Sequence, residues 1–331
     1  MDPVVLPAPP MPPISSITAP LLLGSLSNTY LFGILCVQTY LYHLSFPSDA
    51  AYIKALVYGV FAIDATATIM NVSDTFQWFA NGFGNPLALD NVQLSPADTP
   101  LIGALIAGIV QAFYCYRIFK IEHRAWPISV FIMLIVAVQI AGGLWGSIIA
   151  FQVQSFRSAA EKASGSPWII FVGAAVADTL IAGTMILLLN SKQSAIHYHT
   201  KNSLSKIIQL TAETNLLSTV VALITMILFV TEKGTTYFTF PSLILGKVYS
   251  NSLLLILNNR TYLATDAQRS HQRDALGSRT GQYSSGAMNM GVLRPKTPVI
   301  ERTRGIQVDM NTSVHMDQER KGNPWTHGSS Y

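Results

Sequence analysis

Seven long apolar segments constrain the fold of this chain more than any other feature of its sequence. Each is long enough to cross a hydrocarbon core of roughly 30 Å at about 1.5 Å per residue. The second segment is the most polar, so the alternative is six spans with this segment lying in the membrane interface. The expected spans are about 21–43, 51–75, 99–119, 126–150, 168–190, 207–230 and 237–257.

The charge content also favours an integral membrane protein. Charged residues make up 11% of the chain and hydrophobic residues 50%, whereas a soluble domain has about 25% charged residues. We therefore predict an all-α fold, a bundle of seven transmembrane helices over residues 21–260 with the lipid bilayer as its main partner. Residues 1–20 are rich in proline and predict an extended extracellular tail, and the polar residues 261–331 predict a disordered basic cytoplasmic tail.

Basic residues in the connections predict the orientation of the bundle. The N-terminal tail and the connection 76–98 contain no lysine or arginine. The connections after the third and fifth segments do, at Arg117, Lys120, Arg124, Lys192, Lys201 and Lys206. The positive-inside rule then places the N-terminus outside and the C-terminus in the cytoplasm. We expect a multi-pass protein of the plasma membrane rather than of an endomembrane.

The connection 76–98 is the longest on the predicted outer side. Gly82, Gly84, Asn85 and Pro86 are typical of turns. We interpret this connection either as a lid that faces a ligand or as an ordinary surface loop. Aromatic residues near the ends of the segments predict interfacial belts, namely Tyr30, Tyr42, Tyr52, Trp78, Trp126, Trp168 and Tyr237.

Three ionisable residues lie well inside predicted spans: Asp64, Asp178 and Lys247. A cation in the middle of a bilayer costs roughly 2.5–3.5 kcal/mol, so Lys247 needs a partner. Asp64 is the first choice, because the second and seventh segments both flank the first. Asp178, at a similar depth in the fifth segment, is the second choice.

Polar side chains extend these positions into stripes at helical spacing. The candidate intramembrane ligand site consists of Asp64, Asp178, Lys247, Asn251, Asn215 and Ser250, and the polar residues at helix ends are Glu213, Asn258 and Arg260. With lipid outside, such groups face one another or a wet cavity. Two interpretations stay open: interhelical hydrogen bonds that hold the bundle together, or a site for a ligand or proton.

The sequence offers little support for catalysis. It contains no HExxH, GxSxG or P-loop motif, and we expect no enzyme activity, no catalytic residue, no cofactor and no metal. The two cysteines, Cys36 and Cys115, both lie in apolar segments and predict no disulfide framework. We expect no nucleic-acid partner, because the net charge of +4 reflects membrane orientation.

Three runs in the C-terminal half resemble a known family. The most specific is Gly246-Lys247-Val-Tyr-Ser250-Asn251-Ser-Leu-Leu, followed by Leu-Asn258-Asn-Arg260. The other two are 174–183 around Asp178 and 207–218 around Asn215. Residues of about 172–262 thus resemble multi-spanning membrane proteins of mushroom-forming fungi, the domain of unknown function 6534, and a broader resemblance covers 24–262. It implies seven helices and a membrane location, and it implies no activity.

Three functions follow as hypotheses. An outer N-terminus, short loops and a basic tail favour a receptor-like or sensory seven-helix protein, although no Asp-Arg-Tyr follows the third segment. The buried Asp and Lys residues favour a small-solute or proton-coupled transporter or channel, although no internal repeat is present. A non-catalytic structural protein is the third. The sequence names neither the small-molecule ligand nor a cytoplasmic partner of the tail.

Overall fold

The computed structural model describes residues 13–192, 198–232 and 235–282. Within these residues seven helices are long and apolar enough to cross a membrane, which confirms the predicted all-α bundle. The second segment is one of them, so the six-span alternative is wrong. The spans are Ser15–Ser45, Ala51–Asn81, Ala97–Ile121, His123–Val153, Gly165–Ser191, Ser205–Thr231 and Thr239–Arg260.

The described residues contain long helices as well as short helices and helical turns. The long ones are α1 (Ser15–Ser45), α2 (Ala51–Phe76), α3 (Gly103–Ile121), α4 (Trp126–Val153), α7 (Gly173–Lys192), α8 (Tyr198–Thr231) and α9 (Thr239–Gln282). The short ones lie between α2 and α3, between α3 and α4, and between α4 and α7, and they are η1 (Gln77–Asn81), η2 (Pro86–Asp90), η3 (Ala97–Ile102), η4 (His123–Ala125), α5 (Phe156–Lys162), α6 (Gly165–Pro167) and η5 (Trp168–Val172). We call the end of the bundle that carries η1, η2 and α5 the α5 end; it is the predicted outer side.

Local sequence explains where α4 begins and ends. Pro127 lies in its first turn, where a missing N–H costs no hydrogen bond. The helix ends at Gln154, which adopts a left-handed φ of 57° and donates its N–H to the carbonyl of Ala150. This C-terminal cap directs the chain into α5 across the α5 end of the bundle.

α9 is the most buried of the spans. In the most apolar stretch of each span, 61% of residues are buried in α9 and 33% in α1. Amide side chains join α9 to α1 at three levels. Asn28 Nδ2 of α1 donates to Leu243 O over 2.7 Å. From α9, Asn251 Nδ2 donates to Leu31 O over 3.1 Å, and Asn258 Nδ2 donates to Gln38 O over 2.9 Å. Because lipid offers no alternative partner, such bonds fix the register of the two helices.

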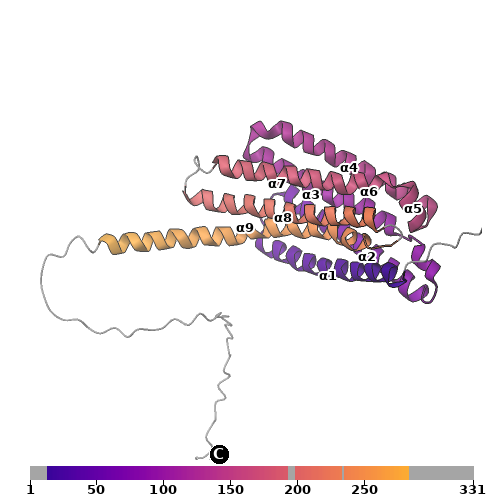
Figure 1. Cartoon of the computed structure of the whole chain (residues 1–331). Coiled ribbons are helices and arrows are strands. Elements are labelled where there is room, and N and C mark those ends of the chain that lie inside the picture. The colour runs from indigo at the N-terminus through magenta and orange to yellow at the C-terminus, as the bar shows by residue number, and fades with distance from the viewer. Residues whose placement is uncertain (1–12, 193–197, 233–234, 283–331) are drawn as a thin grey trace, which may run out of the picture. The chain divides into compact units, whose positions relative to one another are not determined.

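The remaining helices form further packed pairs. α3 packs against α4 and α7, α7 packs against α8, and α1 against α2 (Figure 1). Glycines on α4 permit the close contacts there, since a Cβ at Gly142 would meet the side chain of Ile169, and one at Gly143 the carbonyl of Pro100. The buried apolar residues include Leu35, Val57, Val110, Ile132, Ile181 and Leu253.

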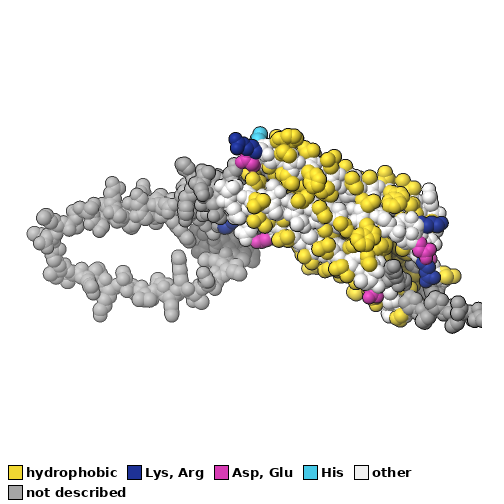
Figure 2. Space-filling model, turned by 45° about the horizontal axis from the view of Figure 1, so that its top comes forward, with side chains coloured by type: hydrophobic (Ala, Val, Ile, Leu, Met, Phe, Trp, Pro, Cys, Tyr) yellow, Lys and Arg dark blue, Asp and Glu magenta, His cyan; other side chains and the backbone are white. Residues whose placement is uncertain are grey.

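The surface of the bundle suits a hydrocarbon environment. Figure 2 shows hydrophobic side chains over the visible middle of the bundle, with charged side chains gathered toward its ends. Large apolar residues are exposed along the spans, among them Ile69 at 71% and Leu187 at 70%. A water-soluble protein would bury such side chains, whereas a bilayer solvates them.

The connection 76–98 is folded rather than an open loop. It contains η1 and η2, and its Asn91 forms an isolated bridge with Ser155. Trp78, predicted to lie in an interfacial belt, is only 2% exposed and donates Nε1–H to Asn91 O over 2.8 Å. The prediction that Trp78 lies in an interfacial belt was wrong, because the folded connection covers its indole. Tyr42, predicted for the same belt, is also buried, at 1% exposure.

Two boundaries differ from the sequence prediction. Helix α1 begins at Ser15, inside the predicted tail 1–20, and residues 1–12 lie outside the described residues. Helix α9 continues to Gln282, past the predicted start of the cytoplasmic tail at residue 261. Residues 261–276 contain no Gly or Pro and several good helix formers, so the backbone hydrogen bonds continue. The rest of the tail, 283–331, lies outside the described residues.

Candidate functional site

Lys247 of α9 is bonded to Asp64 of α2, the first of the two predicted partners. Its Nζ lies 2.6 Å from Asp64 Oδ1 and 2.8 Å from the main-chain oxygen of the same residue. Both side chains are buried, at 2% and 1% exposure. The ammonium also lies 5.3 Å from the centroid of the Phe32 ring, close enough for a cation–π contact. The pair therefore neutralises two charges in the middle of the bundle.

Asp178, the second predicted partner, lies in a separate cluster. Its carboxylate accepts hydrogen bonds from Gln111 Nε2 over 2.8 Å, from Tyr249 OH over 2.7 Å, and from Ser218 Oγ. The donors come from α3, α9 and α8, so this one carboxylate on α7 joins four helices. All four side chains are buried. We call these residues the Asp178 cluster.

Of the other predicted residues, Ser250 and Asn251 lie beside the Lys247–Asp64 pair, and Asn215 and Glu213 do not. Ser250 faces Asp64, and Asn251 Nδ2 donates to Lys247 O as well as to Leu31 O. Asn215 lies apart from Lys247 and donates Nδ2 to Thr211 O over 2.7 Å on its own helix. Glu213 is exposed and accepts a hydrogen bond from Gln209 Nε2 of its own helix, so it belongs to neither region.

Arg260, at the end opposite to the α5 end, holds a third polar contact. Its Nη2 lies 2.6 Å from Asp49 Oδ2, and its guanidinium lies over the Phe46 ring at 4.2 Å. Tyr42 OH donates to the same carboxylate over 2.9 Å. Burial alone would raise the pKa of Asp49, but the hydrogen bonds from Arg260 and Tyr42 outweigh it and lower the pKa below its usual value. The contact therefore ties the α1–α2 connection, which contains Asp49, to α9, which contains Arg260.

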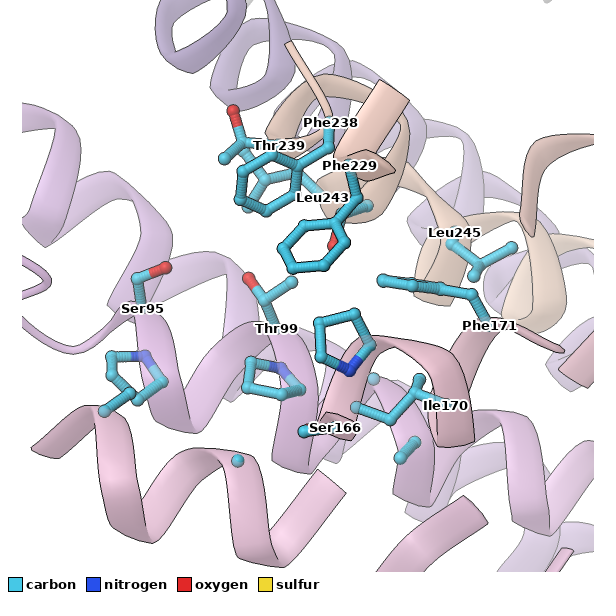
Figure 3. A pocket seen from close by; sticks show the side chains of 18 of the residues that line it. Ser95, Thr99, Ser166, Ile170, Phe171, Phe229, Phe238, Thr239, Leu243 and Leu245 are labelled. Carbon is cyan, nitrogen blue, oxygen red and sulfur yellow. The ribbon is translucent and has the colours of Figure 1, made fainter. Parts of the chain in front are cut away.

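A cavity of about 150 Å³ opens between the helices toward the α5 end. Its walls are mostly apolar, and Figure 3 shows the rings of Phe171, Phe229 and Phe238 turned toward the central space with Ser95 and Thr99 across from them. Trp78 and Phe156 complete the aromatic lining. We call this cavity the α5-end pocket.

Few polar groups line the pocket, and one of them lacks a partner. Gln139 is 1% exposed, and its Oε1 accepts no hydrogen bond from the described residues. Tyr249 reaches the pocket from α9 and bonds Asp178 behind it. A mostly apolar pocket with a few fixed polar groups is the usual form of a small-molecule site.

Each π-helical turn in the described residues contributes to this pocket. η1 provides Trp78, η3 provides Thr99 and Pro100, and η5 provides Ile170 and Phe171. A π-helical turn redirects side chains that a regular helix would align, and such turns occur frequently at functional sites. Here three of them face a single cavity from three different spans.

The comparisons with known proteins identify one segment of the chain. Residues 174–262 match the model of a family of unknown function (DUF6534). The match agrees with the expected region of about 172–262. No curated protein and no solved structure matches the chain. The DUF6534 segment contains Asp178, Ser218, Lys247 and Tyr249, whereas Asp64 and Gln111 come from helices before it.

Most residues of the pocket were not predicted from the sequence. The aromatic residues lie at the ends of different helices, and no shared spacing links them. Asp98 was expected to be the last residue of the connection 76–98, whereas it is 7% exposed within η3. The position of Asp98 just before Thr99 and Pro100, at the start of an apolar run, was the available signal. The described residues contain no group of three or more His, Cys, Asp or Glu suited to a metal.

Proposed function

We propose that this protein is a receptor-like seven-helix sensor that binds a small, mostly apolar molecule in the α5-end pocket. The observation that carries the proposal is the position of Tyr249, which lines the pocket and bonds Asp178. Positive-inside orientation would open the pocket to the outside of the cell. The proposal includes a plasma-membrane location and no catalytic activity. Origin in a mushroom-forming fungus stays a prediction.

The lining supports a ligand with a large apolar body and one polar group. Phe171, Phe229 and Phe238 provide apolar area, and burying it drives binding at about 25 cal/mol per Å². Gln139 Oε1 would accept a hydrogen bond from a hydroxyl or amine of the ligand. A ligand without that donor would leave the amide oxygen unpaired, so the pocket would discriminate against pure hydrocarbons.

The Asp178 cluster supports a response that reaches several helices. A ligand that displaces the Tyr249 ring would alter the hydrogen bond from Tyr249 OH to the Asp178 carboxylate. The same carboxylate accepts hydrogen bonds from Gln111 of α3 and Ser218 of α8. If the ligand binds one arrangement of this cluster more tightly than another, its binding increases the fraction of molecules in that arrangement. Binding at the α5 end would thereby alter the packing of four helices.

A pair of glycine variants tests the proposal. A Cβ on Gly103 would meet no atom within 4 Å, and this residue lines the pocket. A Cβ on Gly33 also meets none, but Gly33 is exposed on α1 away from the pocket. Gly103→Leu should place apolar side-chain atoms in the pocket from a position where the added Cβ meets no atom, and Gly33→Leu is the matched control.

The measurement is thermal stability in nanodiscs against a panel of small alcohols, amines and terpenoids. A true ligand at one hundred times its Kd should stabilise the wild type and Gly33→Leu by about 2.7 kcal/mol. Gly103→Leu should gain far less. Equal gains in all three proteins would show that the compounds bind elsewhere, and no gain in any protein would leave the structural role as the better account.

Proton-coupled transport is the second candidate, favoured by the buried Lys247–Asp64 pair. Intramembrane ion pairs of this kind mark proton and solute pathways in other proteins. Proteoliposomes with a trapped pH-sensitive dye provide the test. Proton flux that Lys247→Ala abolishes would favour transport over sensing.

A further inference from the structure

The short helix α5 turns one face toward the α5-end pocket. The residues of this face line the cavity at positions i, i+3, i+4 and i+7, and they are Phe156, Ala159, Ala160 and, just past the helix, Ala163. This spacing places four side chains on a single side of a helix. Since three of them are alanines, the helix covers the cavity and fills little of it. The other sides of α5 carry the exposed residues Arg157, Glu161 and Lys162.

α5 is less firmly packed than the connection 76–98 beside it. Trp78 and Leu89 of that connection form a buried cluster with Leu21 of α1. In contrast, no residue of α5 is buried. Its Phe156 lies against the cluster with its ring centroid 5.9 Å from that of Trp78. Segments with little buried surface open at a lower free-energy cost than segments that carry core side chains. The connection is therefore the fixed part of this cover, and α5 is the part able to move.

The chain changes direction on both sides of α5. Before the helix, Gln154 adopts a left-handed φ of 57° where α4 ends. After it, Ser166 Oγ donates to Gly142 O over 2.8 Å and ties the chain back to α4. Residues at the ends of elements commonly absorb the backbone rotation of a hinge motion. The segments on either side of α5 thus provide two points about which the helix can turn while the spans stay in place.

Asp90 joins α5 to the fixed connection. Its Oδ2 accepts a hydrogen bond from Ser155 Oγ over 2.7 Å, and its Oδ1 accepts one from Arg157 N over 3.1 Å. Beside it, Asn91 forms an isolated bridge with Ser155. Asp90 is exposed, so water competes for both of its hydrogen bonds. The first turn of α5 is therefore held by contacts that can break without unfolding the bundle.

We propose that α5 is a hinged lid over the α5-end pocket and that Asp90 is the residue that keeps it shut. When Ser155 and Arg157 N leave the carboxylate, α5 turns away and the pocket opens to water at the α5 end. The lid is thus α5, and the connection 76–98 is the frame on which it closes. This inference rests on the proposed function, because it describes how a ligand reaches the pocket, but its test needs no ligand.

The accessibility of a cysteine inside the pocket tests the lid in the full chain in nanodiscs. Ser242 of α9 lines the pocket and is 9% exposed. Ser242→Cys, with Cys36 and Cys115 replaced by alanine, places a single thiol there. A charged methanethiosulfonate reagent, which enters from water and not from lipid, then reports how often the pocket opens. Asp90→Ala removes both hydrogen-bond acceptors and should raise the labelling rate about tenfold, the effect of losing hydrogen bonds to a charged group.

Two further variants serve as controls for this rate. Glu161→Ala removes an exposed carboxylate from the outer side of α5 and should leave the labelling rate unchanged. Phe83→Cys, at a residue 88% exposed at the α5 end, should react equally fast with and without Asp90→Ala and controls for the reagent. Equal rates at the pocket cysteine in Asp90→Ala and Glu161→Ala overturn the role of Asp90. No labelling of the pocket cysteine in any of the proteins overturns the lid.

A disulfide across the lid gives a second test, which does not require Asp90→Ala to fold. Bridged residues of an antiparallel pair lie about 4.5–5.5 Å apart between Cα atoms, a distance that a disulfide spans. Asn91→Cys and Ser155→Cys should therefore cross-link on oxidation. The cross-link should stop labelling of the pocket cysteine, measured by mass spectrometry of its peptide, and reduction should restore it. Continued labelling of the cross-linked protein reveals another entrance and overturns the lid.

The lid and the receptor role can fail separately. Labelling rates that respond to Asp90→Ala and to the cross-link support the lid even if no compound stabilises the protein. Rates that ignore both changes overturn the lid, while stabilisation by a ligand would still support the proposed function.

Discussion

Lys247 Nζ donates to both the carboxylate and the main-chain carbonyl of Asp64, over 2.6 and 2.8 Å. One side chain of α9 is thereby fixed to the backbone as well as to a side chain of α2. The same main-chain oxygen also accepts a hydrogen bond from Thr68 Oγ1 over 2.8 Å. The pair neutralises charge and sets the position of α9 along α2.

Substitutions of this pair should not be additive. Lys247→Ala or Asp64→Asn leaves an unpaired polar or charged group in the bundle, and each should reduce stability by about 3–5 kcal/mol. The double variant should be no less stable than either single variant, because the two losses concern one interaction. Thermal unfolding in nanodiscs measures this cycle, with Lys120→Ala, an exposed cation on α3, as the control. Additive losses would show that the two side chains act independently.

Removal of the Tyr249 hydroxyl should loosen the Asp178 cluster. Tyr249→Phe keeps the ring in the pocket but removes one of three hydrogen bonds to the carboxylate. We expect a loss of about 1–3 kcal/mol, the cost of weakening a buried charged network. Tyr40→Phe, at a tyrosine 62% exposed on α1, should change the stability by less than about 0.5 kcal/mol. Equal effects of both changes would argue against a special role for the cluster.

Because of the Arg260–Asp49 contact, we expect the stability of the protein to fall at acidic pH. The pKa of Asp49 is lowered in the folded protein from its usual value of 3.8. The contact therefore contributes its full stability above that value and loses it as pH falls through the lower folded value. The contribution should be about 1 kcal/mol, because both side chains are partly exposed. Asp49→Asn should be less stable at neutral pH and match the wild type once Asp49 is protonated; a constant difference at all pH values would contradict this account.

Cysteine labelling tests the orientation. With Cys36 and Cys115 replaced by alanine, a single cysteine is introduced at Phe83, which is 88% exposed at the α5 end, or at Lys120, which is exposed at the opposite end. The positive-inside rule predicts that an impermeant maleimide labels Phe83→Cys on intact cells and labels Lys120→Cys only after permeabilisation. The reverse pattern would turn the pocket toward the cytoplasm and contradict an external ligand.

The polar stripes were predictable to different degrees. Lys247 had to find a buried acid, and helix order already favoured Asp64 over Asp178. The role of Asp178 could not be predicted, because its three donors lie on separate helices and none of them carries a charge that demands a partner. Asp98 was misplaced because a helical turn at the start of a span has the same composition as a loop.

The sequence by itself determined the seven spans, because a run of apolar residues in lipid must satisfy its backbone hydrogen bonds within one helix. It also determined that Lys247 would pair. Only the tertiary structure decided which groups meet, since Lys247 and Asp64 lie 183 residues apart and their contact depends on how α9 packs against α2. The same holds for the α5-end pocket, which exists where side chains from the ends of several helices leave space unfilled, and no local pattern records that space.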